Sequence, residues 1–112
     1  MIVSVIGLGY IGLPTAAIIA SKGVKVVGVD LNQNTVDTIN KGNVHIIEPE
    51  LDILVRKVVG DSFLSATIEP EKADIFIVAV PTPFIGNHEP NLSYVKSAVK
   101  AIAKVLEKGN LV

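Results

Sequence analysis

The chain has 112 residues, 49% of them apolar, which suffices for a buried core but for one domain at most. Ten basic and eleven acidic side chains leave a formal net charge of −1 without a long run of either sign, which argues against a nucleic-acid or membrane-surface partner. The absence of cysteine excludes a disulfide, a thiolate nucleophile and a cysteine zinc site within this chain.

The first predicted element is a short apolar strand over residues 2–6, which runs directly into a G-x-G-x-x-G pattern of Gly7, Gly9 and Gly12. A helix is predicted over about 11–22, with Pro14 tolerated in its first turn. In this context the first glycine permits a tight turn, the second lets backbone approach a pyrophosphate, and the third lets the helix pack on the strand. Free N–H groups of the first helical turn would then face the phosphates.

Because glycines interrupt the first apolar stretch and no basic residue precedes it, we expect no signal peptide, no membrane span and a cytoplasmic protein.

A second apolar run, residues 24–29, predicts the next strand and leads to Asp30, 18 residues beyond Gly12. An acid about 20 residues after the glycine motif is expected to accept hydrogen bonds from the adenosine ribose of a dinucleotide. Its carboxylate would also repel a 2′-phosphate, and no Arg stands near it in the sequence, so NAD is favoured over NADP. The alternative is that Asp30 merely caps the helix predicted to start near Asn32.

Strand and helix signals continue to alternate, which predicts a parallel sheet with crossover helices. The expected elements are helices over 32–40 and 50–59, an edge strand over 63–68, a strand buried on both faces over 74–80, a long loop over 81–90, a helix over 93–108 and a new strand from 110. The fold class is therefore α/β, a Rossmann-type doubly wound parallel sheet. We expect residues 1–112 to be one NAD-binding domain, truncated at the start of its fifth strand, and hence a fragment of a longer protein.

Three further features have simple structural interpretations. Lysines recur at every fourth position over residues 96–108, and we interpret them as a solvated helix face rather than as a phosphate site. Glu48 precedes Pro49 and a predicted helix, so we expect its carboxylate to cap that helix; a role near a bound nicotinamide is the alternative. His45 and His88 are far apart and lack a metal-ligand spacing, and we expect no metal site.

Four motifs, taken in order, resemble those of the NAD-binding N-terminal domain of the UDP-glucose/GDP-mannose dehydrogenase family. They are GLGYIGLP at residues 7–14, GVD at 28–30, EPEL at 48–51 and VPTP at 80–83, and the resemblance spans residues 2–112. It implies that the backbone N–H groups of Tyr10 and Ile11 lie at the pyrophosphate. It also implies that Asp30 binds the adenosine ribose and that Thr82, just beyond the fourth strand, contacts NAD.

The resemblance also implies an activity for the full-length enzyme. Family members oxidise the C6 alcohol of a nucleotide sugar to a carboxylate with two NAD, through a thiohemiacetal on a cysteine, for cell-surface polysaccharide synthesis. This chain has no cysteine, and none of its lysines falls in the family's catalytic motif, so we expect it to bind NAD without catalysing. The UDP-sugar site would lie mostly in the absent central helical and C-terminal domains, and the full-length protein would be a homodimer. Three stretches favour one member of the family over the UDP-glucose enzymes: residues 36–40, 45–49, and 79–84 with 88–90.

Other functions fit the same motifs. The chain could be a non-catalytic module that senses NAD or NADH and signals to a partner, because one scaffold carries many functions. A methyltransferase that binds S-adenosylmethionine also combines a glycine loop with a ribose-binding acid, but this glycine spacing suits a dinucleotide better. Within the dehydrogenase family, UDP-glucose or UDP-N-acetylglucosamine is the alternative substrate.

Overall fold

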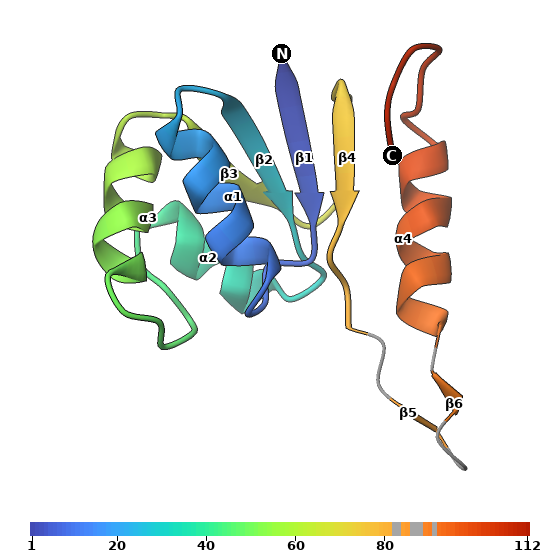
Figure 1. Ribbon diagram of the computed structural model, residues 1–112, viewed down its shortest axis with the longest axis horizontal. Helices are drawn as coiled ribbons and strands as arrows, with labels where there is room; N and C mark the ends of the chain where they lie inside the picture. Colours follow the sequence, from blue (N-terminus) through green and yellow to red (C-terminus); the bar gives the residue numbers. More distant parts are fainter. Residues whose placement is uncertain (82–83, 86–88, 91) are drawn as a thin grey trace.

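A four-stranded parallel sheet forms the centre of the computed structural model, which describes residues 1–81, 84–85, 89–90 and 92–112 (Figure 1). Its strands, in the spatial order β3-β2-β1-β4, are β1 (Ile2–Ile6), β2 (Lys25–Val29), β3 (Leu64–Thr67) and β4 (Ile75–Val78). The helices are α1 (Gly12–Ser21), α2 (Gln33–Asn40), α3 (Leu51–Gly60) and α4 (Ser93–Ala103). The chain builds outward from β1 to β3 and then returns to place β4 on the other side of β1. This order confirms the predicted doubly wound α/β fold.

The segment predicted as a long loop contains a short antiparallel pair. It consists of β5 (Phe84–Ile85) and β6 (Glu89–Pro90), and it is separate from the main sheet. The expectation of a loop without strands was therefore wrong at these residues.

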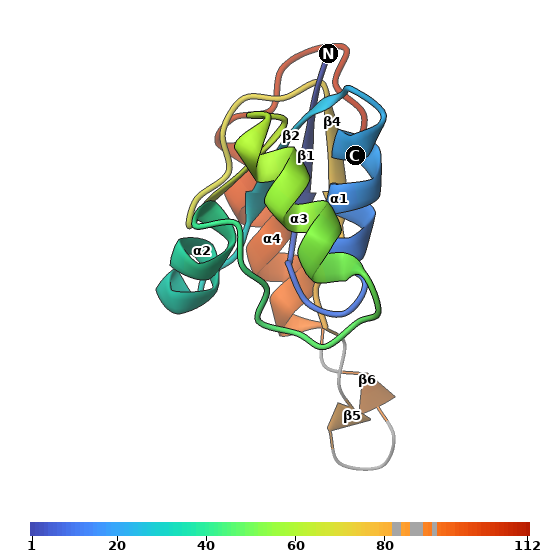
Figure 2. The same cartoon turned by 90° about the vertical axis from the view of Figure 1, so that its left-hand side faces the viewer.

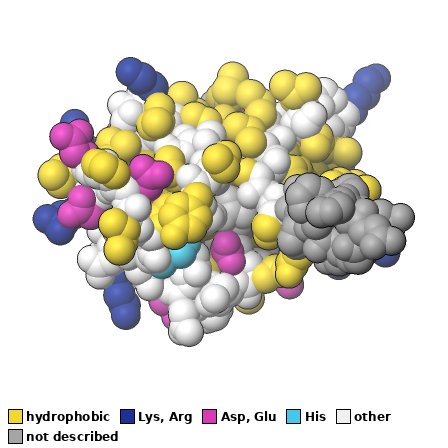
Figure 3. Space-filling model, turned by 60° about the horizontal axis from the view of Figure 1, so that its bottom comes forward, with side chains coloured by type: hydrophobic (Ala, Val, Ile, Leu, Met, Phe, Trp, Pro, Cys, Tyr) yellow, Lys and Arg dark blue, Asp and Glu magenta, His cyan; other side chains and the backbone are white. Residues whose placement is uncertain are grey.

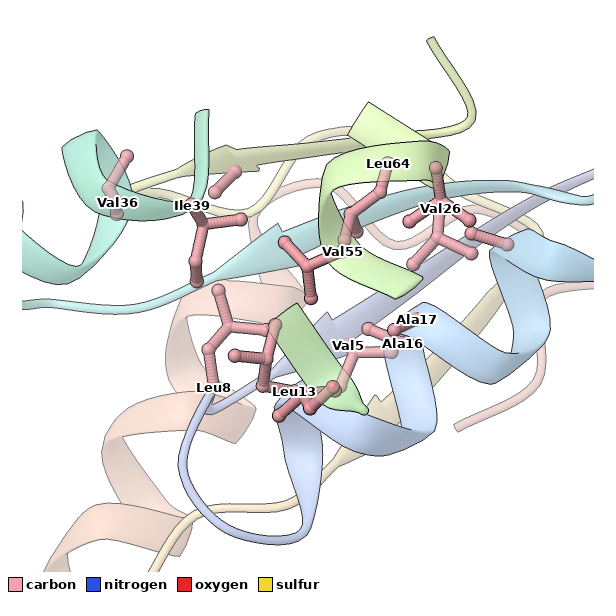
Figure 4. Packing of buried hydrophobic residues seen from close by; sticks show 14 of the residues in the cluster. Val5, Leu8, Leu13, Ala16, Ala17, Val26, Val36, Ile39, Val55 and Leu64 are labelled. Carbon is pink, nitrogen blue, oxygen red and sulfur yellow. The ribbon is translucent and has the colours of Figure 1, made fainter. Parts of the chain in front are cut away.

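The two faces of the main sheet carry different elements. Side chains alternate between the faces along each strand, and the register places Val3 beside Val26 on one face and Ser4 beside Val27 on the other. The first face meets α1 and α3 and forms the larger core, part of which is shown in Figure 4. The second face meets α4, which lies on the opposite side of the strands from α1 (Figure 2). Its smaller cluster of buried residues consists of Ile6, Val29, Phe76, Ala98 and Ile102.

Helix α1 lies close to the sheet because its buried stripe is made of small side chains. Ala16, Ala17 and Ala20 are buried along it, with Leu13 at its start. Within the described part of the chain, no helix is long and apolar enough to cross a membrane.

Helix α4 ends earlier than the lysine repeat predicts. It stops at Ala103, because the amides of Lys104 and Val105 bond to carbonyls three residues back, those of Ala101 at 3.3 Å and Ile102 at 2.9 Å. This tighter turn brings Val105 against the cluster on the second face. The expected continuation of the helix to residue 108 is therefore wrong.

The chain then returns to the sheet beside β4. The amide of Phe76 donates to the carbonyl of Leu111 at 2.8 Å, and the amide of Leu111 donates to the carbonyl of Asp74 at 3.0 Å. This parallel bridge matches the strand start expected from residue 110. β4 itself is less enclosed than predicted: Phe76 is buried, but Ile77 and Val78 are only half-buried. With only one residue of a further strand beside it, β4 lies near an edge and not at the centre of a covered sheet.

At the opposite edge of the sheet, a side chain pairs with β3 at one position. The amide nitrogen of Asn40 donates to the carbonyl of Ala66 at 2.9 Å, and its amide oxygen accepts from the Ala66 N–H at 2.8 Å. A side-chain amide thus takes the place of a neighbouring strand at one position of an otherwise open edge.

Candidate dinucleotide-binding site

The turn between β1 and α1 is built by backbone packed against backbone. Gly7 has a φ of 98°, and a Cβ there would lie 2.6 Å from the carbonyl oxygen of Ala79, just after β4. A Cβ on Gly12 would lie 1.6 Å from the carbonyl oxygen of Gly7. Neither position accepts a side chain without moving main chain, so these two glycines hold the turn against β4.

The middle glycine of the motif has a different environment. Among the described residues other than its two chain neighbours, a Cβ on Gly9 would meet no atom within 4 Å, so this position faces open space. Leu8, beside it, is fully buried over Gly28, where a Cβ would lie 2.7 Å from a terminal methyl of Leu8. Gly28 makes room for the side chain that anchors the turn, a role that the glycine spacing does not indicate.

The start of α1 offers unpaired donors. Within the described chain, the backbone N–H groups of Tyr10, Ile11 and Gly12 have no protein acceptor, whereas Leu13 donates to the carbonyl of Gly9 at 3.1 Å. The helix has no side-chain cap and no acidic residue in its first turn. Free amides and the positive end of the helix dipole together favour an anion at this position.

Asp30 lies at the end of β2 and reaches the glycine turn. Its carboxylate accepts from the amide of Leu8 at 3.1 Å and from the amide of Asn32 at 2.9 Å. It does not cap α2, because Asn32 does so by accepting from the amides of Asn34 at 2.9 Å and Thr35 at 3.3 Å. A carboxylate offers about four acceptor sites, so Asp30 retains capacity for ligand hydroxyls beside its two protein bonds.

These groups open into one cavity of about 1030 Å³. It is bounded by the glycine turn, by Asp30, by residues 68–70 after β3, by residues 79–81 after β4 and by one face of α4. The cavity therefore lies outside the carboxyl ends of the strands, at the switch point between β1 and β4, where open α/β sheets bind ligands. Figure 3 turns this end of the molecule toward the viewer, and apolar side chains prevail over acidic ones on it.

Helix α4 contributes residues to the cavity that the sequence motifs do not indicate. Tyr94, Ser97 and Ala101 line it, as does Lys104 at the C-terminal end of the helix. The spacing of three and four residues could have revealed this stripe, because it runs beside the apolar stripe that packs on the sheet. Lys104 is nevertheless exposed, as expected for the solvated lysine face.

The remaining predicted residues do not all fall in this cavity. Thr82 and His88 lie outside the described residues, whereas Pro81 lines the cavity. Glu48 is exposed, and the N-cap of α3 is Glu50, which has a φ of 65° and makes no side-chain capping bond.

The expectation that the carboxylate of Glu48 caps α3 is therefore wrong. The helix begins at Leu51, which leaves Glu48 two residues before the N-cap, and only its backbone carbonyl accepts from Leu51, at 3.2 Å. Within the described residues, no group of three or more acidic or histidine side chains could hold a metal ion.

A glycine turn at a helix start, an acid at the end of the second strand and a crevice at the switch point define a Rossmann-type dinucleotide-binding domain. Residues 1–112 match the family described as "UDP-glucose/GDP-mannose dehydrogenase family, NAD binding domain", and the chain belongs to this family.

The particular relatives are nucleotide-sugar dehydrogenases. The chain is 71% identical over 111 residues to UDP-N-acetyl-D-mannosamine dehydrogenase of Campylobacter jejuni, covering 98% of this chain and 27% of that protein. Within the family, this enzyme is the member favoured by the three sequence stretches 36–40, 45–49, and 79–84 with 88–90. An NDP-N-acetyl-D-galactosaminuronic acid dehydrogenase of Ralstonia nicotianae is 59% identical over 98% of this chain and 26% of its own length.

Solved structures agree with the sequence matches. The UDP-N-acetyl-mannosamine dehydrogenase Cap5O of Staphylococcus aureus superposes with a TM-score of 0.96 at 40% identity, covering 99% of this chain and 28% of that one. The chain thus spans about a quarter of the length of the relatives it matches.

Proposed function

We propose that this chain is the NAD-binding part of a nucleotide-sugar 6-dehydrogenase that acts on UDP-N-acetyl-D-mannosamine. The C6 alcohol of the sugar would be oxidised to a carboxylate by transfer of two hydrides to two NAD, with water supplying the second oxygen. The observation that carries the proposal is the single cavity into which Gly9, the unpaired amides of α1 and Asp30 all open. The 71% identity to an enzyme of that name supports the choice of sugar.

The residues of the cavity fit NAD. A volume of about 1030 Å³ is at the upper end of ligand pockets, about 300–1,000 Å³, as an extended dinucleotide requires. The open space at Gly9 admits a pyrophosphate close to the backbone, and the amides of Tyr10 and Ile11 supply its donors. The free acceptor sites of Asp30 suit the two hydroxyls of the adenosine ribose.

The task of this chain in the reaction is to bind and orient the cofactor. NAD, when bound, supplies the hydride acceptor. The amides after Gly9 would hold the pyrophosphate, and Asp30 would fix the adenosine end and keep its own position through Leu8 and Asn32. Thr82, which follows β4 by four residues, would contact the cofactor at the switch point. The chain has no cysteine to act as nucleophile, so we expect binding without turnover.

Calorimetric titration of the 112-residue chain with NAD, NADP and S-adenosylmethionine tests the proposal. We expect NAD to bind, NADP to bind more weakly, and S-adenosylmethionine not to bind. Binding of S-adenosylmethionine in preference to NAD would overturn the dinucleotide assignment. A polypeptide of the relatives' length that carries this chain should form two NADH per UDP-N-acetyl-D-mannosamine, whereas the 112-residue chain should form none.

A second substrate remains a candidate because of a specific similarity. The 59% identity to an NDP-N-acetyl-D-galactosaminuronic acid dehydrogenase is also high. Because these 112 residues match an NAD-binding domain, their similarity bears on the cofactor more directly than on the sugar. Initial rates of the longer polypeptide with UDP-N-acetyl-D-mannosamine and UDP-N-acetyl-D-galactosamine decide between the two sugars.

A further inference from the structure

A groove of about 450 Å³ lies between α1 and α3, on the first face of the sheet, whereas α4 borders the cofactor cavity on the second face. We infer that this α1–α3 groove is where the sugar-binding remainder of the longer polypeptide docks on the NAD-binding part. The inference rests on the proposed function, since it takes the chain to belong to a longer dehydrogenase.

The groove is surrounded by large apolar side chains that remain exposed. Ile18 of α1 is 53% exposed and Ile53 of α3 is 64% exposed, and both line the groove. Ile47, directly before the lining residue Glu48, is 97% exposed. Exposed apolar surface gathered around a groove and rimmed by polar residues marks a contact with another protein surface.

The loop that carries Ile47 is anchored on both sides of it. Ile46 is buried in the core of the first face, and Leu51 is buried where α3 begins. Between them, the amide of Leu51 donates to the carbonyl of Glu48 at 3.2 Å. The backbone therefore presents Ile47 outward from between two fixed positions, and packing within the described residues does not account for so exposed an isoleucine.

The groove lies at the same end of the sheet as the cofactor cavity. Helix α1 starts directly after β1 ends, and α3 ends directly before β3 begins, so both helices start at the carboxyl ends of the strands (Figures 1 and 2). Ile11 lines the cavity and Pro14 lines the groove, and these residues are three positions apart at the start of α1. The cavity and the groove are thus adjoining surfaces, separated by the first turn of α1.

The length of the relatives identifies the occupant of the groove. The chain spans 27% of the relative to which it is 71% identical, so about three quarters of such a polypeptide lies outside these residues. Hydride transfer requires the sugar to come within about 3–3.5 Å of the cofactor. The part that holds the sugar must therefore lie against the carboxyl ends of the strands, where the cavity and the groove adjoin.

The charges at the groove favour this occupant over a second copy of the chain. Glu48, Glu50 and Lys57 line it, and none of the three takes part in an ion pair within the described residues. A two-fold interface at this place would set both carboxylates near those of the other copy. A different surface can instead bring basic groups to the two acids and an acid to Lys57, around an apolar centre.

The first test compares hydrogen exchange in the 112-residue chain and in a polypeptide of the relatives' length that carries it. The backbone amides of Asp52 and Ile53, in the first turn of α3, have no protein acceptor within the described residues. They should exchange rapidly in the 112-residue chain. In the longer polypeptide we expect exchange at least about tenfold slower, because the docked part shields this turn from water.

The second test is Ile53→Gln, which keeps a long side chain on the helix and removes its apolar surface. Arg56→Gln is the matched control, because Arg56 is an exposed residue of the same helix outside the groove. In the 112-residue chain, both variants should melt within about 2 °C of the unmutated chain and bind NAD with a Kd changed less than about twofold. In the longer polypeptide, Ile53→Gln should speed exchange at the start of α3 and lower kcat/KM for the UDP-sugar about five- to tenfold, and Arg56→Gln should do neither.

Equal exchange at these amides in the two polypeptides, or equal effects of Ile53→Gln and Arg56→Gln, would overturn the inference. A dimer of the 112-residue chain that Ile53→Gln dissociates would also overturn it, because a second copy would then occupy the groove. If the longer polypeptide bound no NAD and oxidised no sugar but still shielded the start of α3, the proposed function would fall and the docking surface would stand. Exchange therefore distinguishes the failure of one from the failure of the other.

Discussion

The face of the sheet that meets α1 and α3 differs from the face that meets α4 in how completely it is closed. On the first face, Leu13 and Ala16 of α1 and Val55 of α3 interlock with strand residues such as Val5 in one continuous core (Figure 4). On the second face, α4 covers only a small cluster around Phe76, and the space beside it remains as the cavity.

The difference shows how one sheet serves two purposes. The small side chains of α1 let that helix come close and complete a core. Helix α4 packs on the sheet through Ala98 and Ile102 while its neighbouring stripe borders open space. Stability should therefore depend mainly on the first face and ligand affinity mainly on the second, and substitutions on each side can test that division.

The largest expected effect on stability is at Leu13, which is fully buried on the first face. Leu13→Ala should lower the free energy of unfolding by about 3–5 kcal/mol, because it leaves a cavity in a core that cannot collapse around it. Chemical denaturation followed by circular dichroism measures this loss.

The matched change on the second face is Ile102→Ala, which removes an equally buried side chain from the smaller cluster. It should cost less, about 2 kcal/mol, because neighbours can shift at the border of an existing cavity. Equal losses in the two variants would mean that the two faces contribute alike and would contradict the comparison.

The next effect separates affinity from stability at the glycine turn. Gly9→Val places a side chain in the open space where the pyrophosphate would lie, so the Kd for NAD should rise at least about 100-fold, or about 2.7 kcal/mol. The melting temperature should stay within about 2 °C of the unmutated chain, since among the described residues no atom beyond Gly9 and its two chain neighbours lies within 4 Å of the new Cβ. Gly12→Ala is the contrasting variant, because its Cβ meets the carbonyl of Gly7 and should reduce both stability and binding. If Gly9→Val bound NAD normally, the glycine turn would be structural only.

Local features of this fold could be predicted because they depend on neighbours in the sequence. The glycine spacing, the apolar strand runs and Asp30 at the end of the second run are all read over a few residues, and the structure brings the last of these beside Leu8. The end of α4 could not be predicted in the same way. Gly109 is a strong stop signal, but the helix already ends at Ala103 because Val105 turns in to pack on the sheet.

Packing between distant elements also explains why two residues of the candidate site could not be predicted. Lys104 enters the cavity only because of where α4 lies relative to β1 and β2, and Gly28 matters only because Leu8 rests on it. Neither relation is local in sequence. Both are consequences of packing between elements that periodicity identifies but does not position.

The smallest of the expected effects concerns β3, the outermost strand of the sheet on the side away from β4. Asn40 and Ala66 are 26 positions apart, and their two hydrogen bonds join α2 to the outermost strand. Asn40→Asp keeps an acceptor for the Ala66 N–H but sets a second oxygen against the Ala66 carbonyl. It should lower the free energy of unfolding by about 1–2 kcal/mol, a value moderated because Asn40 is exposed and water can replace its bonds.

Asn43→Asp controls for the added charge, since Asn43 is an exposed neighbour whose backbone amide, and not its side chain, donates to Thr38 at 3.0 Å. An equal loss in Asn40→Asp and Asn43→Asp would assign the effect to charge and not to the edge. Asn40→Leu, which frees the Ala66 groups without adding charge, should in addition increase self-association in light scattering, because an unpaired strand edge recruits other strands. If Asn40→Leu lost stability but stayed monomeric, the Asn40 side chain would hold α2 in place without protecting the β3 edge. The short length of β3, four residues, would then be what protects this edge from pairing with other strands.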